Sequence, residues 1–170
     1  MERTDTELVR LTRQGDRGAF QELVERHQRK VYAVLLGMLH DHDAAWETSQ
    51  ETFIEALCCL DRFKGEASFS TWLYRIAVNV AIDYQRHERH PPRVGVADTT
   101  VAAQSREIGE RVCAAIAQLT PEHRAAILLR EVEGLSYEEI SRVMECAKGT
   151  VMSRLHYARK KLQAQLQDCL

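Results

Sequence analysis

Apolar residues recur at helical spacing along almost the whole chain, and this periodicity limits the possible folds more than any other feature of the sequence. In the N-terminal part the apolar residues are Phe20, Leu23, Val24, Val31, Val34, Leu35 and Met38. Intervals of three, four and seven residues place such side chains on one face of a helix. No segment shows the sustained alternation of apolar and polar residues that a half-buried strand requires. The sequence therefore predicts an all-α fold.

Capping residues mark several of the expected helix starts. Thr4 with Glu7, and Ser136 with Glu139, have the spacing of a capping box. Thr120 before a proline suits an N-cap followed by the first helical residue. Together with the apolar pattern, these signals predict helices at 5–14, 17–39, 44–60, 69–89, 106–118, 121–133, 137–144 and 148–166.

One stretch in the middle of the chain lacks a continuous amphipathic stripe. It contains Pro91 and Pro92, two of the three prolines of the chain, and proline disfavours helix at the residue before it. The composition predicts two helical domains, at 1–89 and 105–170, joined by a flexible linker at 90–104.

The charge balance gives no sign of a polyanionic partner. The chain has 23 Lys and Arg against 25 Asp and Glu, a net charge of -2, so any nucleic-acid signal must be local. No apolar run approaches the roughly 18 residues needed to cross a bilayer, and residues 1–14 lack the apolar centre of a signal peptide. We therefore expect a cytoplasmic protein without membrane insertion.

The five cysteines and seven histidines show no spacing typical of a metal site. The sequence has no CxxC pair, no Cys and His pattern that fits zinc, and no recognisable constellation around a nucleophile. A redox role for the adjacent Cys58 and Cys59 is disfavoured, because neighbours on a helix point about 100° apart. We expect no metal, no cofactor and no enzymatic activity.

The segment 135–162 has the pattern of a helix-turn-helix. A short capped helix is followed by a turn near 145–147 and then by a longer helix. The first helix offers an apolar surface made of Ile140, Val143 and Met144. The longer helix carries a matching stripe made of Val151, Leu155, Ala158 and Leu162. Packing these surfaces together would leave the opposite face of the longer helix exposed.

That exposed face and its flanks are basic. Residues 147–162 include five basic residues and no acidic one. A charged run is usually a solvated surface, but a helix built for solubility would mix signs, whereas a helix in the major groove needs cations for phosphates. Gly149 and Thr150 lie where the helix N-terminus would approach a phosphate. The predicted DNA-binding residues are Lys148, Gly149, Thr150, Met152, Ser153, Arg154, His156, Tyr157, Arg159 and Lys160.

Three segments carry a resemblance to a known family. Residues 63–86, FKGEASFSTWLYRIAVNVAIDYQR, closely resemble the promoter-melting and minus-10 segment of bacterial sigma factors of the extracytoplasmic-function group. The run SQETF at 49–53 is similar to the polymerase-binding helix of that family, and residues 119–162 are similar to its region 4. The resemblance implies that residues 1–89 form sigma region 2 and residues 105–170 form sigma region 4.

Members of this family bind core RNA polymerase and direct it to promoter DNA. The resemblance implies contacts with the clamp of the largest subunit and the flap of the second-largest subunit, help in opening the duplex, and no chemistry by the chain itself. It also implies control by an anti-sigma factor. The residues alone leave open a plain helix-turn-helix regulator that binds an operator as a dimer.

The resemblance further implies which residues meet the minus-10 strand. Capturing an extruded base requires a pocket, a polar group for the base edge and cations for the backbone. The candidate residues are Phe63, Lys64, Gly65, Ser68, Arg75, Asn79 and Arg86. Asn79 carries both the donor and the acceptor that base-edge reading requires. Trp72 falls in an apolar stripe, so we expect it to pack in the core rather than to stack on a base.

The sequence departs from the family pattern in two places. The candidate polymerase-binding residues are Glu47, Gln50, Glu51 and Phe53. Ahead of the Gln50 and Glu51 pair, Trp46 and Thr48 replace part of an acidic, leucine-containing run, so the clamp contact should differ in detail. In region 4, Met152, His156 and Tyr157 stand where relatives often have Arg or Phe, so base preference in the minus-35 element should differ as well.

Overall fold

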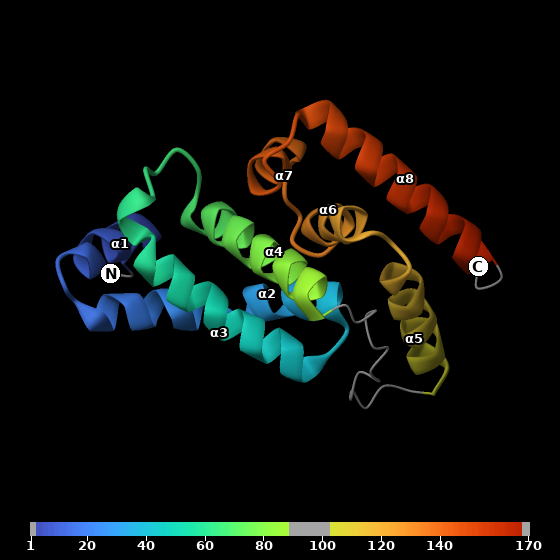
Figure 1. The fold of residues 1–170 in the computed structure, drawn as a ribbon, viewed down its shortest axis with the longest axis horizontal. Coiled ribbons are helices and arrows are strands. Elements are labelled where there is room, and N and C mark those ends of the chain that lie inside the picture. The colour runs from blue at the N-terminus through green and yellow to red at the C-terminus, as the bar shows by residue number, and fades with distance from the viewer. Residues whose placement is uncertain (1–2, 89–102, 168–170) are drawn as a thin grey trace.

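The computed structural model describes residues 3–88 and 103–167, and in the second range it describes side chains from residue 108 onward. These residues form helices and their connections (Figure 1). The elements are α1 (Asp5–Arg13), α2 (Arg17–Leu39), α3 (His42–Cys58), the short 3-10 helix η1 (Leu60–Arg62), α4 (Phe69–Glu88), α5 (Ala103–Ala117), α6 (Pro121–Glu131), α7 (Tyr137–Val143) and α8 (Lys148–Leu166). The all-α prediction is confirmed. Within these residues no helix is long and apolar enough to span a membrane.

The predicted caps form the helix starts. Ser136 Oγ accepts a hydrogen bond from the Glu139 amide at 3.2 Å, and the Glu139 carboxylate accepts one from the Ser136 amide at 2.7 Å. Thr120 and Thr4 each cap a helix through the hydroxyl group. The largest shift is at α5, which begins at Ala103 rather than at residue 106. Residues 103 and 104, predicted as linker, are therefore helical, and the rest of the predicted linker lies outside the described residues.

The first four helices form one bundle around α2. This helix packs against α1, α3 and α4, and its buried face includes Leu23, Val31 and Leu35. In the second half, α8 packs on α6 and α7. The predicted stripe of α8 is buried through Val151, Leu155 and Ala158, against Ile140 and Val143 of α7, and Leu162 is partly buried.

The two halves of the chain are packed against each other. Helix α6 lies on α2 and α7 lies on α4, and the buried apolar residues of both halves form one continuous cluster. In Figure 1, α6 sits between α8 and the N-terminal helices. The sequence predicted the two groups of helices but not the contact between them, because each half shows a complete amphipathic pattern on its own.

Candidate functional site

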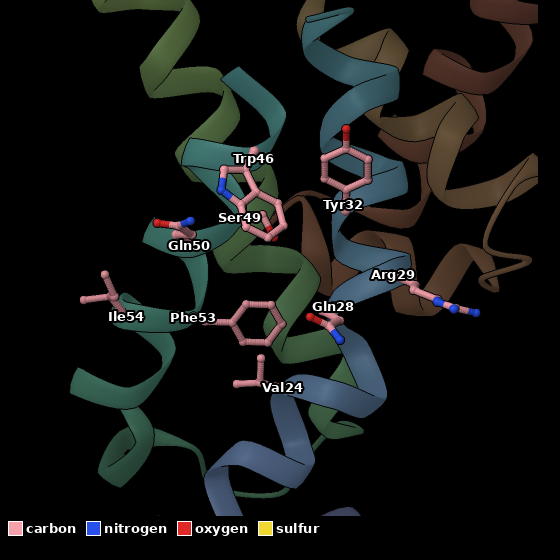
Figure 2. Close-up of a pocket in the computed structure, with 9 residues that line it drawn as sticks. All are labelled: Val24, Gln28, Arg29, Tyr32, Trp46, Ser49, Gln50, Phe53 and Ile54. Atoms are coloured by element: carbon pink, nitrogen blue, oxygen red, sulfur yellow. The ribbon is translucent and has the colours of Figure 1, made fainter. Parts of the chain in front are cut away.

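An apolar groove of about 700 Å³ lies between α2 and α3. Its walls consist of Val24, Gln28, Arg29, Tyr32, Trp46, Ser49, Gln50, Phe53 and Ile54. Figure 2 shows Trp46 and Phe53 of α3 facing Tyr32 and Val24 of α2. Trp46 is 61% exposed and Ile54 is 65% exposed. Large apolar side chains exposed side by side in a groove are typical of a protein-binding surface.

The groove includes two of the four predicted polymerase-binding residues. Gln50 and Phe53 line it, whereas Glu47 and Glu51 are exposed on α3 outside its lining. Sequence reasoning missed Ile54 and the whole α2 wall. A signal was present, because the buried stripe of α3 is already complete without Trp46, Ile54 and Leu57. Apolar residues in excess of a complete buried stripe mark a second apolar face.

A second cavity, of about 550 Å³, lies beside the loop that leads from η1 into α4. It is lined by Arg62, Phe63, Lys64, Gly65, Glu66, Ala67, Thr71, Trp72, Arg75, Arg142 and Glu145. We call it the loop cavity. Gly65 has a φ of 74°, a conformation that favours glycine and lets the loop turn tightly. Four cations and two aromatic rings in one cavity suit an anionic, ring-bearing ligand such as a nucleotide.

The predicted minus-10 residues separate into two groups in the structure. Phe63, Lys64, Gly65 and Arg75 line the loop cavity. Asn79 is exposed one turn beyond Arg75 on α4, and Arg86 is exposed about two turns further along, with Nη1 3.8 Å from Oδ1 of Asp83. These residues form one row on the solvent side of α4.

Phe63 and Ser68 also have structural contacts. Phe63 is buried, with its ring centroid 5.9 Å from that of Phe69 and 5.3 Å from that of Trp72. Ser68 Oγ accepts a hydrogen bond from the Thr71 amide at 3.1 Å, as an N-cap of α4 does. Trp72 packs against the core and also lines the loop cavity, so the core interpretation was right only in part.

The predicted DNA-binding residues of α8 lie together along the helix and its exposed face. Those exposed to solvent are Lys148, Gly149, Met152, Ser153, His156, Tyr157, Arg159 and Lys160. Thr150 and Arg154 are half-buried at the flank. Helix α8 begins at Lys148, so the amides of its first turn point out of the helix end beside Gly149.

Two members of this face have partners within the protein. Arg159 Nη2 lies 2.6 Å from Oε1 of Glu131 on α6, so part of its charge is neutralised. The rings of Tyr157 and His123 lie 4.7 Å apart, which holds Tyr157 against α6. Burial, and secondarily Arg154, lowers the pKa of His123, which disfavours the charged form of the ring beside Tyr157. Among the predicted cations of α8, Arg159 therefore has the least charge left for a phosphate. The contact with His123 holds the Tyr157 ring in place on the exposed face.

Comparison with known proteins relates these surfaces to one family. The model for sigma-70 region 2 matches residues 23–90, and the model for sigma-70 region 4 matches residues 110–162. The RNA polymerase sigma-H factor of Pseudomonas aeruginosa is 36% identical over 98% of this chain and 95% of its own length. The ECF RNA polymerase sigma-E factor of Escherichia coli is 38% identical over 98% of this chain and 96% of its own length. The chain belongs to the extracytoplasmic-function group of the sigma-70 family.

Solved sigma factors share the arrangement of the helices. CnrH in complex with the cytosolic domain of CnrY has a TM-score of 0.77 and 27% identity, with 96% of this chain and 97% of that chain covered. The sigma factor RpoE in complex with the anti-sigma factor NepR from Bartonella quintana has a TM-score of 0.68 and 25% identity, with coverages of 87% and 96%. As an alternative sigma factor, the chain is not an enzyme and acts in promoter-specific initiation by RNA polymerase.

Proposed function

We propose that three surfaces divide the work of this sigma factor. The groove between α2 and α3 holds core RNA polymerase, the loop cavity with the solvent face of α4 holds the minus-10 strand, and α8 reads the minus-35 element. The domain limits that follow are 1–89 for region 2, 90–104 for the linker and 105–170 for region 4. The observation that carries the proposal is that one chain exposes an apolar groove and two cationic helical faces on separate surfaces.

The groove suits a helical partner. An amphipathic helix buries its apolar face in such a groove, and polar residues at the rim set its register. Trp46, Phe53 and Ile54 supply the apolar anchors, while Glu47 and Glu51 supply a charged rim beside them. We assign the groove to the coiled coil of the polymerase clamp.

An anti-sigma factor is proposed to control the protein by covering the same groove. The support is that RpoE of Bartonella quintana was solved with the anti-sigma factor NepR and that the groove is exposed in this chain.

We also propose that the protein acts in the cytoplasm, where core polymerase is found, and that region 4 contacts the flap of the second-largest subunit.

The minus-10 strand would run from the loop cavity along α4. Lys64, Arg75 and Arg86 are placed to meet phosphates, and Asn79 to read a base edge. Gly65 allows the loop to approach the strand closely. Phe63 and Ser68 act indirectly, by holding the loop and the start of α4.

The minus-35 element would be read by the middle of α8. Met152, Ser153, His156 and Tyr157 are the base-facing candidates, because they project from the exposed face opposite the buried stripe. The phosphate contacts are assigned to Lys148, Gly149, Thr150, Arg154 and Lys160, with Arg159 in a minor role because Glu131 neutralises part of its charge. Base contacts specify the sequence, and phosphate contacts position the helix.

Transcription with purified core polymerase on a library of promoter fragments tests the proposal. Wild-type protein should produce run-off transcripts above those of core enzyme alone. Ile54→Arg should lower retention of the protein by immobilised core polymerase at least about tenfold, because a charge in the centre of an apolar interface is left unpaired. Val132→Arg is the matched control, since Val132 is a similarly exposed apolar residue outside the groove. An equal loss of retention in both variants would refute the assignment of the groove to core polymerase.

A further inference from the structure

A side chain from outside the helix-turn-helix packs against the proposed minus-35 face of α8. His123 lies in the first turn of α6, and its ring centroid is 4.7 Å from that of Tyr157, with the two ring planes tilted by 42°. Tyr157 is 53% exposed, whereas His123 is half-buried. One of the base-facing candidates of α8 is therefore supported by a residue of another helix.

The ring of His123 is itself held by the N-cap of α6. Oγ1 of Thr120 accepts a hydrogen bond from the His123 amide at 3.4 Å and also lies within hydrogen-bond distance of Nδ1 of the same residue. Because the amide uses a lone pair of Oγ1, the hydroxyl proton is left for Nδ1, which accepts it when the ring is neutral. Burial lowers the pKa of His123 and so favours the neutral ring. The cap residue thus sets the orientation of the imidazole as well as the start of the helix.

The contact with a fixed imidazole favours one orientation of the Tyr157 side chain. A long side chain on a helix has two common χ1 rotamers, and packing against His123 stabilises the one that brings the phenol ring toward α6. A tyrosine hydroxyl both donates and accepts hydrogen bonds, so the base edge that it reads depends on where the ring holds it. A side chain that is already ordered also loses less rotamer freedom when it binds.

Helix α8 is kept in its place by contacts that do not involve His123. Nη2 of Arg159 lies 2.6 Å from Oε1 of Glu131, and Nζ of Lys161 donates to the carbonyl oxygen of Gln118 at 2.7 Å. The buried stripe of α8 packs on α6 and α7 as well. Removing the His123 ring therefore leaves the helix where it is and frees the Tyr157 side chain alone.

We propose that His123 is a positioning residue that sets the base preference at one position of the minus-35 element, through its hold on the Tyr157 ring. This inference rests on the proposed function, in which α8 reads the minus-35 element. His123 and Tyr157 then act as one reading unit, half of which lies in a helix that precedes the helix-turn-helix. Positions of the element that Tyr157 does not meet are independent of His123.

The test uses holoenzyme made from core polymerase and the full-length chain, transcribing a promoter library whose minus-35 block is randomised. Sequencing the transcribed templates gives the base preference at each position, and Tyr157→Ala identifies the position that Tyr157 reads. His123→Ala should lower the preference at that position about three- to tenfold, because an unheld ring must be ordered on binding. The other positions should keep their preference. His123→Phe retains a ring beside Tyr157 and should restore most of the loss.

A control variant and a second measurement separate positioning from stability. Gln118→Ala removes an exposed side chain whose Oε1 lies 2.5 Å from Nε2 of Gln165 on α8, and it should leave every base preference unchanged. Fluorine NMR of the full-length protein labelled with fluorotyrosine reports on the Tyr157 ring directly. The chain has five tyrosines, so the Tyr157 signal is identified by its absence in Tyr157→Phe. His123→Ala should move this signal toward its position in the unfolded chain.

The outcomes distinguish the role of His123 from the proposed function. Absence of transcripts with the wild type, or a minus-35 preference that Tyr157→Ala leaves unchanged at every position, rejects the proposed reading by α8 and the role of His123 with it. A Tyr157-dependent preference that survives His123→Ala rejects the positioning role alone. So does an unchanged fluorine signal in His123→Ala, or a fall in transcription that is equal for all minus-35 sequences, since the latter is what a purely structural residue would produce.

Discussion

Arg124→Met is expected to destabilise the protein strongly, because this buried guanidinium joins the ends of two helices. Arg124 is 2% exposed. Its Nε donates to the carbonyl oxygen of Ile116 at 3.1 Å, and Nη2 donates to those of Ala117 at 2.7 Å and Leu119 at 2.8 Å. Nη1 donates to Met38 across the contact between the halves. Burial lowers the pKa of Arg124 to about 10, so the group remains charged at neutral pH.

The expected loss in the free energy of unfolding follows from the carbonyl groups that lose a hydrogen-bond donor. Met38 keeps its hydrogen bond from Gln85, whereas the acceptors at the end of α5 lose the guanidinium. An unsatisfied buried polar group costs about 1–3 kcal/mol, and the relief of burying one charge fewer offsets part of the sum. A net loss of about 4 kcal/mol is within the range for breaking a buried charged network.

Urea unfolding followed by circular dichroism measures this loss. With a slope of about 2 kcal/mol per molar urea, a loss of 4 kcal/mol lowers the midpoint by about 2 M. Arg10→Met is the matched control, because Arg10 is exposed on α1 and its change should stay within about 0.5 kcal/mol. A midpoint shift below about 0.5 M for Arg124→Met would show that the guanidinium is not the support described here.

Three further outcomes are expected. Burial, and secondarily Arg124, lowers the pKa of His40 from 6.5 to about 4. As the pH falls, the unfolded chain therefore binds a proton at this residue before the folded chain does. The free energy of unfolding should fall by up to about 3 kcal/mol between pH 6.5 and 4. His40→Asn should flatten this part of a urea titration against pH, because asparagine tolerates the left-handed conformation of His40 (φ 54°); an unchanged slope would contradict the assignment. Lys160→Ala should weaken binding to every duplex sequence and reduce the salt dependence by about one ion, while Tyr157→Ala should change the preference within the minus-35 element. Equal losses on matched and scrambled duplexes in both variants would show that this division of roles is wrong. Ser136→Ala should cost about 1 kcal/mol in thermal unfolding through loss of the α7 cap, and no change in Tm would indicate that the cap is dispensable.

Local features of the fold were predictable from the sequence because their causes are local. The Ser136 and Glu139 capping box, the Thr120 cap and the buried stripe of α8 depend on residues within one or two turns of each other. The helix-turn-helix could therefore be placed to within a few residues. The exposed face of α8 followed directly, since a buried stripe determines which residues remain outside.

The contact between the halves was not predictable, because it depends on residues far apart in the sequence. Gly37 and Leu128 meet only once both domains are folded. Nothing in the pattern of α6 distinguishes Arg124 from a surface arginine, although it lies in the core. The contacts of Phe63 and Ser68 with the start of α4 were not predicted for a related reason, since a residue in a functional segment can also support the fold of that segment.

The two tryptophans of the chain give each surface its own optical reporter. Trp46 lines the groove between α2 and α3 and Trp72 lines the loop cavity, and the sequence contains no other tryptophan. Replacing either one by phenylalanine leaves a single indole whose emission reports on one surface. Quenching by acrylamide could then follow the occupation of the groove and of the cavity separately, without an attached dye.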